Sequence, residues 1–126
     1  MRAIDTNVLV RLMSRDHRAQ VAVAEEFVRP GAWVSHLVLV EAVWVLSSVY
    51  QVEAKRIGAA VQMLLEHEQL AIQEADVVAA ALARFRRRPA VGFSDCLILE
   101  TARKAGHGPL GTFDRKLAKL EGAQRL

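Results

Sequence analysis

The sequence predicts an α/β fold in which helices cover both faces of a central parallel sheet of about five short strands. Short apolar runs alternate along the chain with segments whose apolar residues recur at helical spacing. Glycine and proline stand at several boundaries between the two patterns. A chain of 126 residues that is 52% hydrophobic can build one core, so we expect a single domain over residues 1–126 and exclude a disordered tail protein.

The first half of the chain supplies two expected strands and four expected helices. Pro30 and Gly31 stop a helical pattern just before an apolar run that is typical of a buried strand. Ser35 follows that run and can cap the next helix. We expect strands at residues 2–5 and 32–35, and helices at residues 6–13, 16–29, 35–50 and 53–68.

The second half continues the alternation with shorter segments. An alanine-rich helical pattern ends at Pro89, and Gly106 closes the helix that follows. We expect strands at residues 70–72, 108–112 and 124–126, and helices at residues 75–88, 94–104 and 114–120. Parallel strands place ligands beyond their carboxyl ends, so a functional site is expected there.

The composition limits the cellular compartment and the kinds of partner that we expect for this protein. The lone Cys96 can form no internal disulfide and lacks a second thiolate for a zinc site, which suits a reducing cytosol. No apolar run reaches the ~20 residues that span a bilayer, and Asp5 interrupts any signal peptide, so we expect a soluble, cytoplasmic protein. A net charge of +3 gives a mild bias toward polyanions and names no partner.

Four carboxylates stand out from the others, which have charged or polar neighbours. Asp5 and Asp114 end expected strands, and Asp95 falls in the first turn of its helix, so these three can converge on one crevice. Glu41 lies inside an apolar helical segment that we expect to pack inward, where an ionised carboxylate needs compensation.

Two explanations compete for these residues. Helix capping and dipole interactions would account for Asp5, Asp95 and Asp114, but they leave Glu41 unexplained. If all four share a pocket, each pair at about 4 Å repels by about 4 kcal/mol at an effective dielectric constant of about 20, and a divalent cation would resolve the conflict. Oxygen ligands favour Mg²⁺ or Mn²⁺, and no zinc spacing occurs among the histidines, which are His17, His36, His67 and His107. We therefore favour a metal site.

Four blocks in this order carry a resemblance to a known family: residues 4–11, 40–46, 93–98 and 110–116. Together they resemble the PIN-domain ribonucleases, and specifically the VapC-type toxins of type II toxin-antitoxin modules. The resemblance covers the chain from end to end and implies a PIN-like three-layer α/β/α sandwich. It also implies a Mg²⁺- or Mn²⁺-dependent endoribonuclease with four catalytic carboxylates, which would here be Asp5, Glu41, Asp95 and Asp114.

The resemblance further implies roles for individual residues. Asp5 and Asp95 would ligate the metal, while Asn7 and Thr112 would support the acidic cluster. A metal-activated water would attack the phosphodiester, with Glu41 or Asp114 orienting it, and would leave a 5′-phosphate and a 3′-hydroxyl. Many similar toxins carry an Asp where this chain has Gly92, so one or two metal ions both remain open.

The expected partners are an RNA substrate, a second copy of the chain and a cognate antitoxin. Four cations follow the acidic motifs closely enough to hold RNA: Arg11, Arg15, Arg115 and Lys116. The group formed by Arg84 and residues 86–88 is interpreted instead as a solvated helix end. Trp33 and Trp44 are interpreted as packing residues. The alternative to a nuclease is a catalytically silent PIN-like module that binds RNA or protein.

Overall fold

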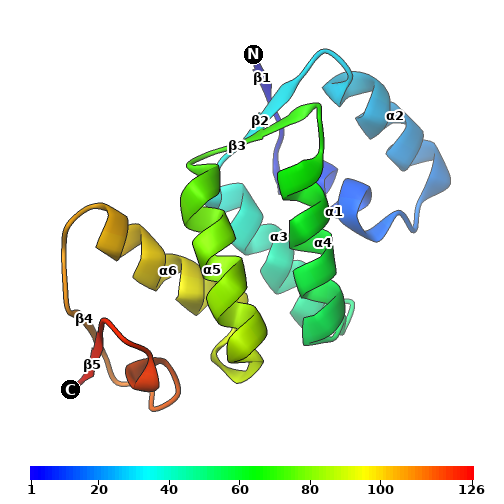
Figure 1. The fold of residues 1–126 in the computed structure, drawn as a ribbon. Coiled ribbons are helices and arrows are strands. Elements are labelled where there is room, and N and C mark those ends of the chain that lie inside the picture. The colour runs from blue at the N-terminus through cyan, green and yellow to red at the C-terminus, as the bar shows by residue number, and fades with distance from the viewer. The chain divides into compact units, whose positions relative to one another are not determined.

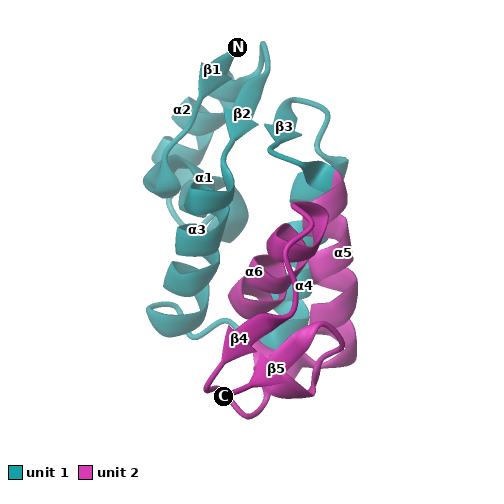
Figure 2. Ribbon diagram, turned by 90° about the vertical axis from the view of Figure 1, so that its left-hand side faces the viewer, with its two compact units in different colours: residues 1–75 teal, residues 76–126 magenta.

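A computed structural model describes residues 1–126 and divides them into two compact units. We call residues Met1–Ala75 the N-terminal unit and residues Asp76–Leu126 the C-terminal unit (Figure 2). That both units form a single domain remains a prediction of the sequence. None of the helices is both long and apolar enough to cross a membrane.

The N-terminal unit combines a three-stranded parallel sheet with four helices (Figure 1). Strand β2 is central, with Ala32 opposite Arg2 of β1 on one side and opposite Leu70 of β3 on the other. The elements are β1 (Arg2–Ala3), α1 (Thr6–Ser14), α2 (Arg18–Val28), β2 (Ala32–Val34), α3 (His36–Ser48), α4 (Ala54–Glu66) and β3 (Leu70–Ile72).

The core of this unit forms where α1 packs against α3. Leu9 of α1 and Leu39 of α3 are almost completely buried, as is Val34 of β2. Ser35 begins α3 as predicted, because its hydroxyl accepts a hydrogen bond from the Val38 amide at 3.1 Å. The cap that the sequence predicts at Ser35 is therefore present in the folded protein.

The C-terminal unit contains two long helices and a two-stranded parallel sheet. Its core packs Phe85 edge-on against Phe93, with ring centroids 6.1 Å apart. Cys96 is fully buried, and burial raises the pKa of its thiol to about 11. The elements are α5 (Ala75–Arg87), the 3₁₀ turn η1 (Pro89–Val91), α6 (Phe93–Lys104), β4 (Leu110–Thr112), the 3₁₀ turn η2 (Leu117–Lys119) and β5 (Ala123–Arg125).

The predicted α/β class is confirmed, with five short strands whose pairings are all parallel. The strands form a three-stranded and a two-stranded sheet, whereas the sequence predicted one sheet, because β4 hydrogen-bonds only to β5. The helix expected at residues 114–120 is the single turn η2, and the first strand ends at Ala3 rather than at Asp5. Each strand spans only two or three residues, so periodicity could locate it but could not assign its neighbour.

Candidate active site

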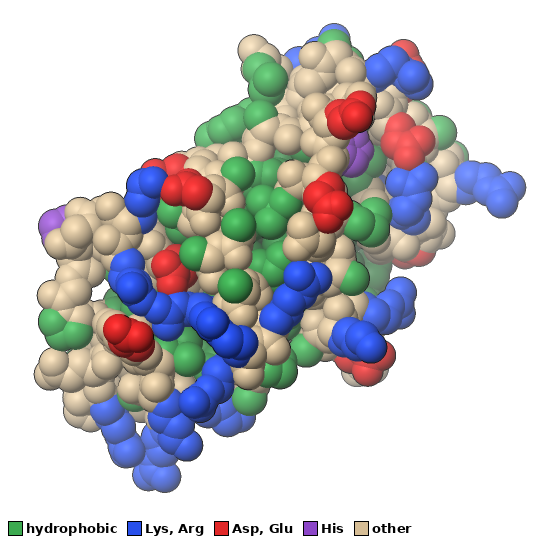
Figure 3. All heavy atoms as spheres, in the orientation of Figure 1, with side chains coloured by type: hydrophobic (Ala, Val, Ile, Leu, Met, Phe, Trp, Pro, Cys, Tyr) green, Lys and Arg blue, Asp and Glu red, His purple; other side chains and the backbone are tan.

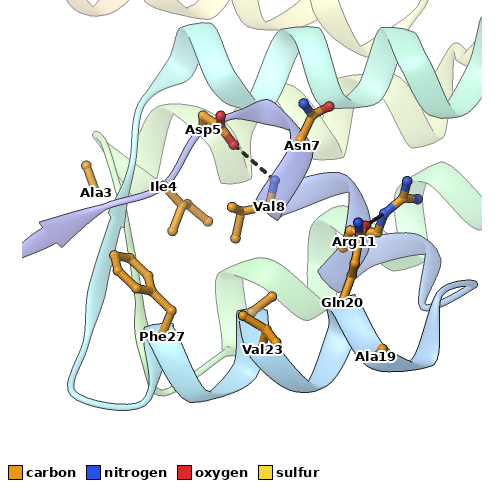
Figure 4. Close-up of a pocket in the computed structure, with 11 residues that line it drawn as sticks. Ala3, Ile4, Asp5, Asn7, Val8, Arg11, Ala19, Gln20, Val23 and Phe27 are labelled. Carbon is orange, nitrogen blue, oxygen red and sulfur yellow. Dashed lines mark hydrogen bonds between the residues drawn. The ribbon is translucent and has the colours of Figure 1, made fainter.

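Asp5 stands at the N-terminus of α1, directly after the short first strand. Its Oδ1 accepts a hydrogen bond from the Val8 amide at 3.1 Å, and its extended backbone makes it the N-cap. The side chain is exposed. Figure 4 shows Asp5 and Asn7 on the side of α1 away from α2. One predicted site residue therefore has a structural role as a helix cap, and its second carboxylate oxygen accepts no hydrogen bond.

Glu41 is exposed, so the expectation that it lies buried in an inward-packing helix face is wrong. Helix α3 is apolar around most of its circumference and buries the face that carries Leu39, Ala42 and Leu46. Glu41 lies on another face together with Trp44, which is 59% exposed. The apolar neighbours in the sequence therefore did not indicate which side of the helix meets the core.

The hydroxyl of Thr6 donates a hydrogen bond to Oε1 of Glu41. This bond joins the first residue of α1 to the middle of α3 and brings Glu41 to the helix end that Asp5 caps. No periodic signal in the sequence could have paired Thr6 with a residue 35 positions away. Within the N-terminal unit, two of the four predicted carboxylates thus lie near each other.

Asp95 lies in the first turn of α6 and is half-buried. It accepts no hydrogen bond and forms no ion pair, although an acid in a first turn usually gains from the helix dipole. Desolvation, together with the negative charge of Asp114, raises the pKa of this carboxyl above its ordinary value. A carboxyl group in this condition is typical of a functional site.

Asp114 follows β4 and is held by the backbone around it. Its Oδ1 accepts hydrogen bonds from the amides of Lys116 and Leu117, each at 2.8 Å. Its own amide donates to the hydroxyl of Thr112 at 3.0 Å. Thr112 therefore supports Asp114 within the C-terminal unit, while Oδ2 accepts no hydrogen bond from the protein.

The four predicted carboxylates divide evenly, with Asp5 and Glu41 in the N-terminal unit and Asp95 and Asp114 in the C-terminal unit. Within neither unit do three His, Cys, Asp or Glu side chains gather in a group that could hold a metal ion. Capping is confirmed for Asp5 and Asp114 and does not account for Asp95. That all four share one ion remains a prediction.

The four cations predicted to bind RNA differ in their surroundings. Arg11 donates hydrogen bonds to Asp16, at 3.1 Å, and to the Tyr50 hydroxyl, at 2.9 Å. Arg15 forms an ion pair with Glu25 at 2.6 Å. Arg115 and Lys116 are exposed and form no ion pair. The sequence placed these four residues in one class, whereas the structure leaves only the last two without an acidic partner.

Three of the four histidines form local hydrogen bonds through their rings. Nδ1 of His17 caps α2 by accepting from the Gln20 amide at 3.2 Å, and Nδ1 of His67 accepts from the Gln69 amide at 3.1 Å. Nε2 of His36 lies 2.6 Å from the carbonyl oxygen of Gln73.

A groove of about 710 Å³ lies between α1 and α2. Its walls are mainly apolar and include Ile4, Val8, Val23 and Phe27, which point into it (Figure 4). Asp5 also lines this groove, so apolar surface begins directly beside a predicted site residue.

The comparison with protein-family models agrees with the motifs. The model described as PIN domain matches residues 3–123. The chain belongs to the PIN domain family. PIN domains are generally nucleases that use divalent metal ions, so the family supports a hydrolase that acts on nucleic acid. No curated protein and no solved structure matches the chain.

The match to the PIN family covers both pairs of carboxylates. Both pairs lie within residues 3–123, the range that the PIN model matches. Carboxylate oxygens are hard ligands of the type that Mg²⁺ and Mn²⁺ prefer, and the pairs offer no sulfur and no imidazole. Each pair therefore offers ligand atoms of the type that suits the metal ions used by the family.

Proposed function

We propose that this PIN-domain protein is a Mg²⁺- or Mn²⁺-dependent endoribonuclease and the toxin component of a VapC-type toxin-antitoxin pair. The observation that carries the nuclease is the pair formed by Asp95 and Asp114. Asp95 is a half-buried carboxyl without a protein partner, and desolvation, together with the charge of Asp114, raises its pKa. Position in the first turn of α6 explains a favourable dipole interaction of Asp95, but it does not explain a desolvated carboxyl without a hydrogen-bond partner, which is typical of a functional site.

Asp5 and Asp95 are the proposed metal ligands, since each has a carboxylate oxygen that accepts no protein hydrogen bond. A bound divalent ion would lower the pKa of its water and neutralise charge on the scissile phosphate. Its positive charge would also favour the ionised form of Asp95, whose surroundings otherwise favour the protonated form. Asn7 and Thr112 are proposed to support the cluster, Thr112 through its bond to the Asp114 amide.

The remaining two carboxylates are proposed to handle the proton. Asp114 is held through Oδ1 by two amides, so Oδ2 can accept a proton from the attacking water without loss of the cap. Glu41 is the other candidate, because the Thr6 hydroxyl fixes Oε1 and leaves Oε2 available. Attack by water in line with the leaving group leaves a 5′-phosphate and a 3′-hydroxyl.

The proposed partners follow from the same assignment. We propose an RNA substrate, a second copy of the chain and a cognate antitoxin in the cytoplasm. An antitoxin arginine that reached the carboxylates would form charge-assisted hydrogen bonds there and would compete with the metal. The apolar groove beside Asp5 supports this partner, because a peptide bound in it would end close to a proposed metal ligand.

A catalytically silent PIN-like module that binds RNA or protein is the second candidate. The caps formed by Asp5 and Asp114 favour it, because these carboxylates have structural roles that need no metal. The two candidates differ in what chelation and a single charge removal do to RNA cleavage.

The test is cleavage of an end-labelled RNA by the purified protein with Mg²⁺ or Mn²⁺, with and without EDTA. We expect cleavage that EDTA stops, and a loss of roughly a hundredfold or more in Asp95→Asn and Asp5→Asn. Asp76→Asn is the matched control, because Asp76 is an exposed acid of the C-terminal unit that pairs with Lys104. Cleavage that survives EDTA would contradict the metal mechanism, and absence of cleavage with either ion would favour the silent module.

A further inference from the structure

Positive charge is distributed unequally between the two units. The C-terminal unit carries ten Lys and Arg against five Asp and Glu, a net charge of +5. The N-terminal unit carries seven Lys and Arg against nine Asp and Glu, a net charge of −2. The modest charge of the whole chain therefore conceals a strongly basic part and a weakly acidic part.

The acids of the C-terminal unit do not neutralise this excess. Asp76 forms an ion pair with Lys104. Glu100 forms ion pairs with Arg84 and, at 3.9 Å, with Arg103. Of the other seven cations, Arg86 also has an interaction partner. The remaining six are exposed and form no ion pair, and we call them the C-terminal basic surface: Arg87, Arg88, Arg115, Lys116, Lys119 and Arg125. In the N-terminal unit three of the seven cations, Arg11, Arg15 and Arg29, are ion-paired, and its acids outnumber its cations.

One hydrogen bond brings the members of this surface to the same end of the unit. Nη1 of Arg84, in the last turns of α5, donates to the carbonyl oxygen of Glu121 at 3.3 Å. Glu121 lies between η2, which carries Lys119, and β5, which carries Arg125. Figure 3 shows Lys and Arg side chains gathered where the end of α5 meets η2 and β5.

Stabilisation of the helix end does not account for this arrangement. A cation in the last turn of α5 interacts favourably with the helix dipole, which explains Arg87. Arg88 lies beyond the helix, and the loop cations Arg115 and Lys116 belong to no helix of useful length. Repulsion among exposed cations that lack acidic partners is a cost unless a polyanion binds there.

We propose that the C-terminal basic surface binds the phosphate backbone of RNA, with Arg87 and Arg88 as contacts additional to Arg115 and Lys116. This inference rests on the proposed function for the identity of the polyanion. Arg88 precedes Asp95 by seven positions. Even a fully extended chain of that length would separate their Cα atoms by at most about 25 Å. A strand held at Arg88 can therefore extend to the carboxylate pair of the same unit.

The experiment measures binding of a fluorescein-labelled RNA hairpin with single-stranded flanks, in EDTA so that no cleavage occurs. We expect Arg87→Gln/Arg88→Gln to weaken binding about five- to tenfold and to lower the slope of log Kd against log salt by about 1.4, or about 0.7 for each lost contact. Lys55→Gln/Arg56→Gln is the matched control, because it removes two adjacent exposed cations from the N-terminal unit. We expect it to leave both quantities unchanged.

The charge-preserving variant Arg87→Lys/Arg88→Lys should retain the wild-type slope, which separates an electrostatic contact from a folding defect. An unchanged slope in the Gln variant, an equal loss in the control, or no RNA binding by the wild type would overturn the inference. A preference for duplex DNA of the same sequence over RNA would also overturn it. Binding that behaves as expected in a protein that cleaves no RNA with Mg²⁺ or Mn²⁺ would leave the inference standing and contradict the proposed nuclease.

Discussion

The two units hold their charged side chains in different ways. In the N-terminal unit the carboxylates Asp5 and Glu41 are exposed and hydrogen-bonded, and its ion pairs lie on the surface. In the C-terminal unit Asp95 is half-buried without a partner, and Arg84 and Glu100 form an ion pair in which each side chain is less than 15% exposed. The comparison shows that the N-terminal unit keeps these carboxylates exposed and hydrogen-bonded, whereas the C-terminal unit holds one carboxyl partly desolvated without a partner beside a nearly buried ion pair.

The largest expected difference in stability concerns the ion pairs. Arg84→Met removes the main partner of the nearly buried Glu100 and the bond to the Glu121 carbonyl, so we expect a loss of roughly 2–4 kcal/mol. Arg15→Met breaks a pair whose side chains are 51% and 46% exposed, so we expect a loss of about 0–1 kcal/mol. Urea unfolding of both variants measures this, and equal losses would break the comparison.

Gly92 is the next test, because it begins the helix that carries Asp95. Its φ of +90° is rarely adopted by residues with a side chain, although a Cβ would meet no atom within 4 Å. We expect Gly92→Asp and Gly92→Ala to lose about 1–2 kcal/mol each through backbone strain alone. Gly111→Ala, where φ is ordinary and the added Cβ would contact the Leu126 side chain at 3.5 Å, is the control in the same urea titration.

The backbone strain expected of a substituted residue 92 bears on whether the proposed site holds one metal ion or two. The backbone at Gly92 disfavours the Asp that many similar toxins carry at this position, so the substitution would not restore that residue without cost. Equal stability of Gly92→Asp and the wild type would contradict this explanation.

The two caps sharpen the comparison on a smaller scale. Asp114→Ala leaves two amides without their acceptor and should cost about 1–2 kcal/mol, whereas Asp5→Ala leaves one and should cost about 1 kcal/mol. The Asn variants should differ little from the wild type, because Asn caps as well as Asp. Melting temperatures of the metal-free protein test this, and a large loss in Asp5→Asn would show that the charge itself stabilises α1.

The smallest effect is a pH dependence at Asp95. Because its folded-state pKa is raised above the ordinary value of 3.8, the folded protein binds the proton more tightly, and this carboxyl lowers the free energy of unfolding as pH rises above 3.8. Asp95→Asn removes that cost, so we expect a small rise in melting temperature at neutral pH that disappears below pH 3.8. The same rise at acidic pH would mean that desolvation of the charge is not its cause.

Local signals predicted most of the secondary structure. The Ser35 cap, the stop at Pro30 and Gly31, and the positive φ of Gly106 after α6 all depend on neighbouring residues, and all appear in the structure. The division of five strands between two sheets was not predicted, because pairing depends on residues distant in sequence.

At the candidate site, too, local sequence patterns predicted some features and missed others. The motifs placed Asp95 in a first turn and Asp114 at a strand end, and the structure agrees. They could not show that Glu41 is exposed or that Thr6 donates to it, because an apolar helix does not reveal which of its faces the core selects. Trp33, at 41% exposed, and Trp44 were interpreted as packing residues and are instead among the exposed hydrophobics for the same reason.

By itself the sequence determined the α/β class and the PIN family, because these depend on residue type and on order along the chain. Only the tertiary structure decided which acids cap helices, that Asp95 lacks a partner, and which cations remain unpaired in the C-terminal unit. The physical reason is that hydrogen bonding, desolvation and charge pairing act over a few ångströms in space, whatever the separation of the residues in the chain.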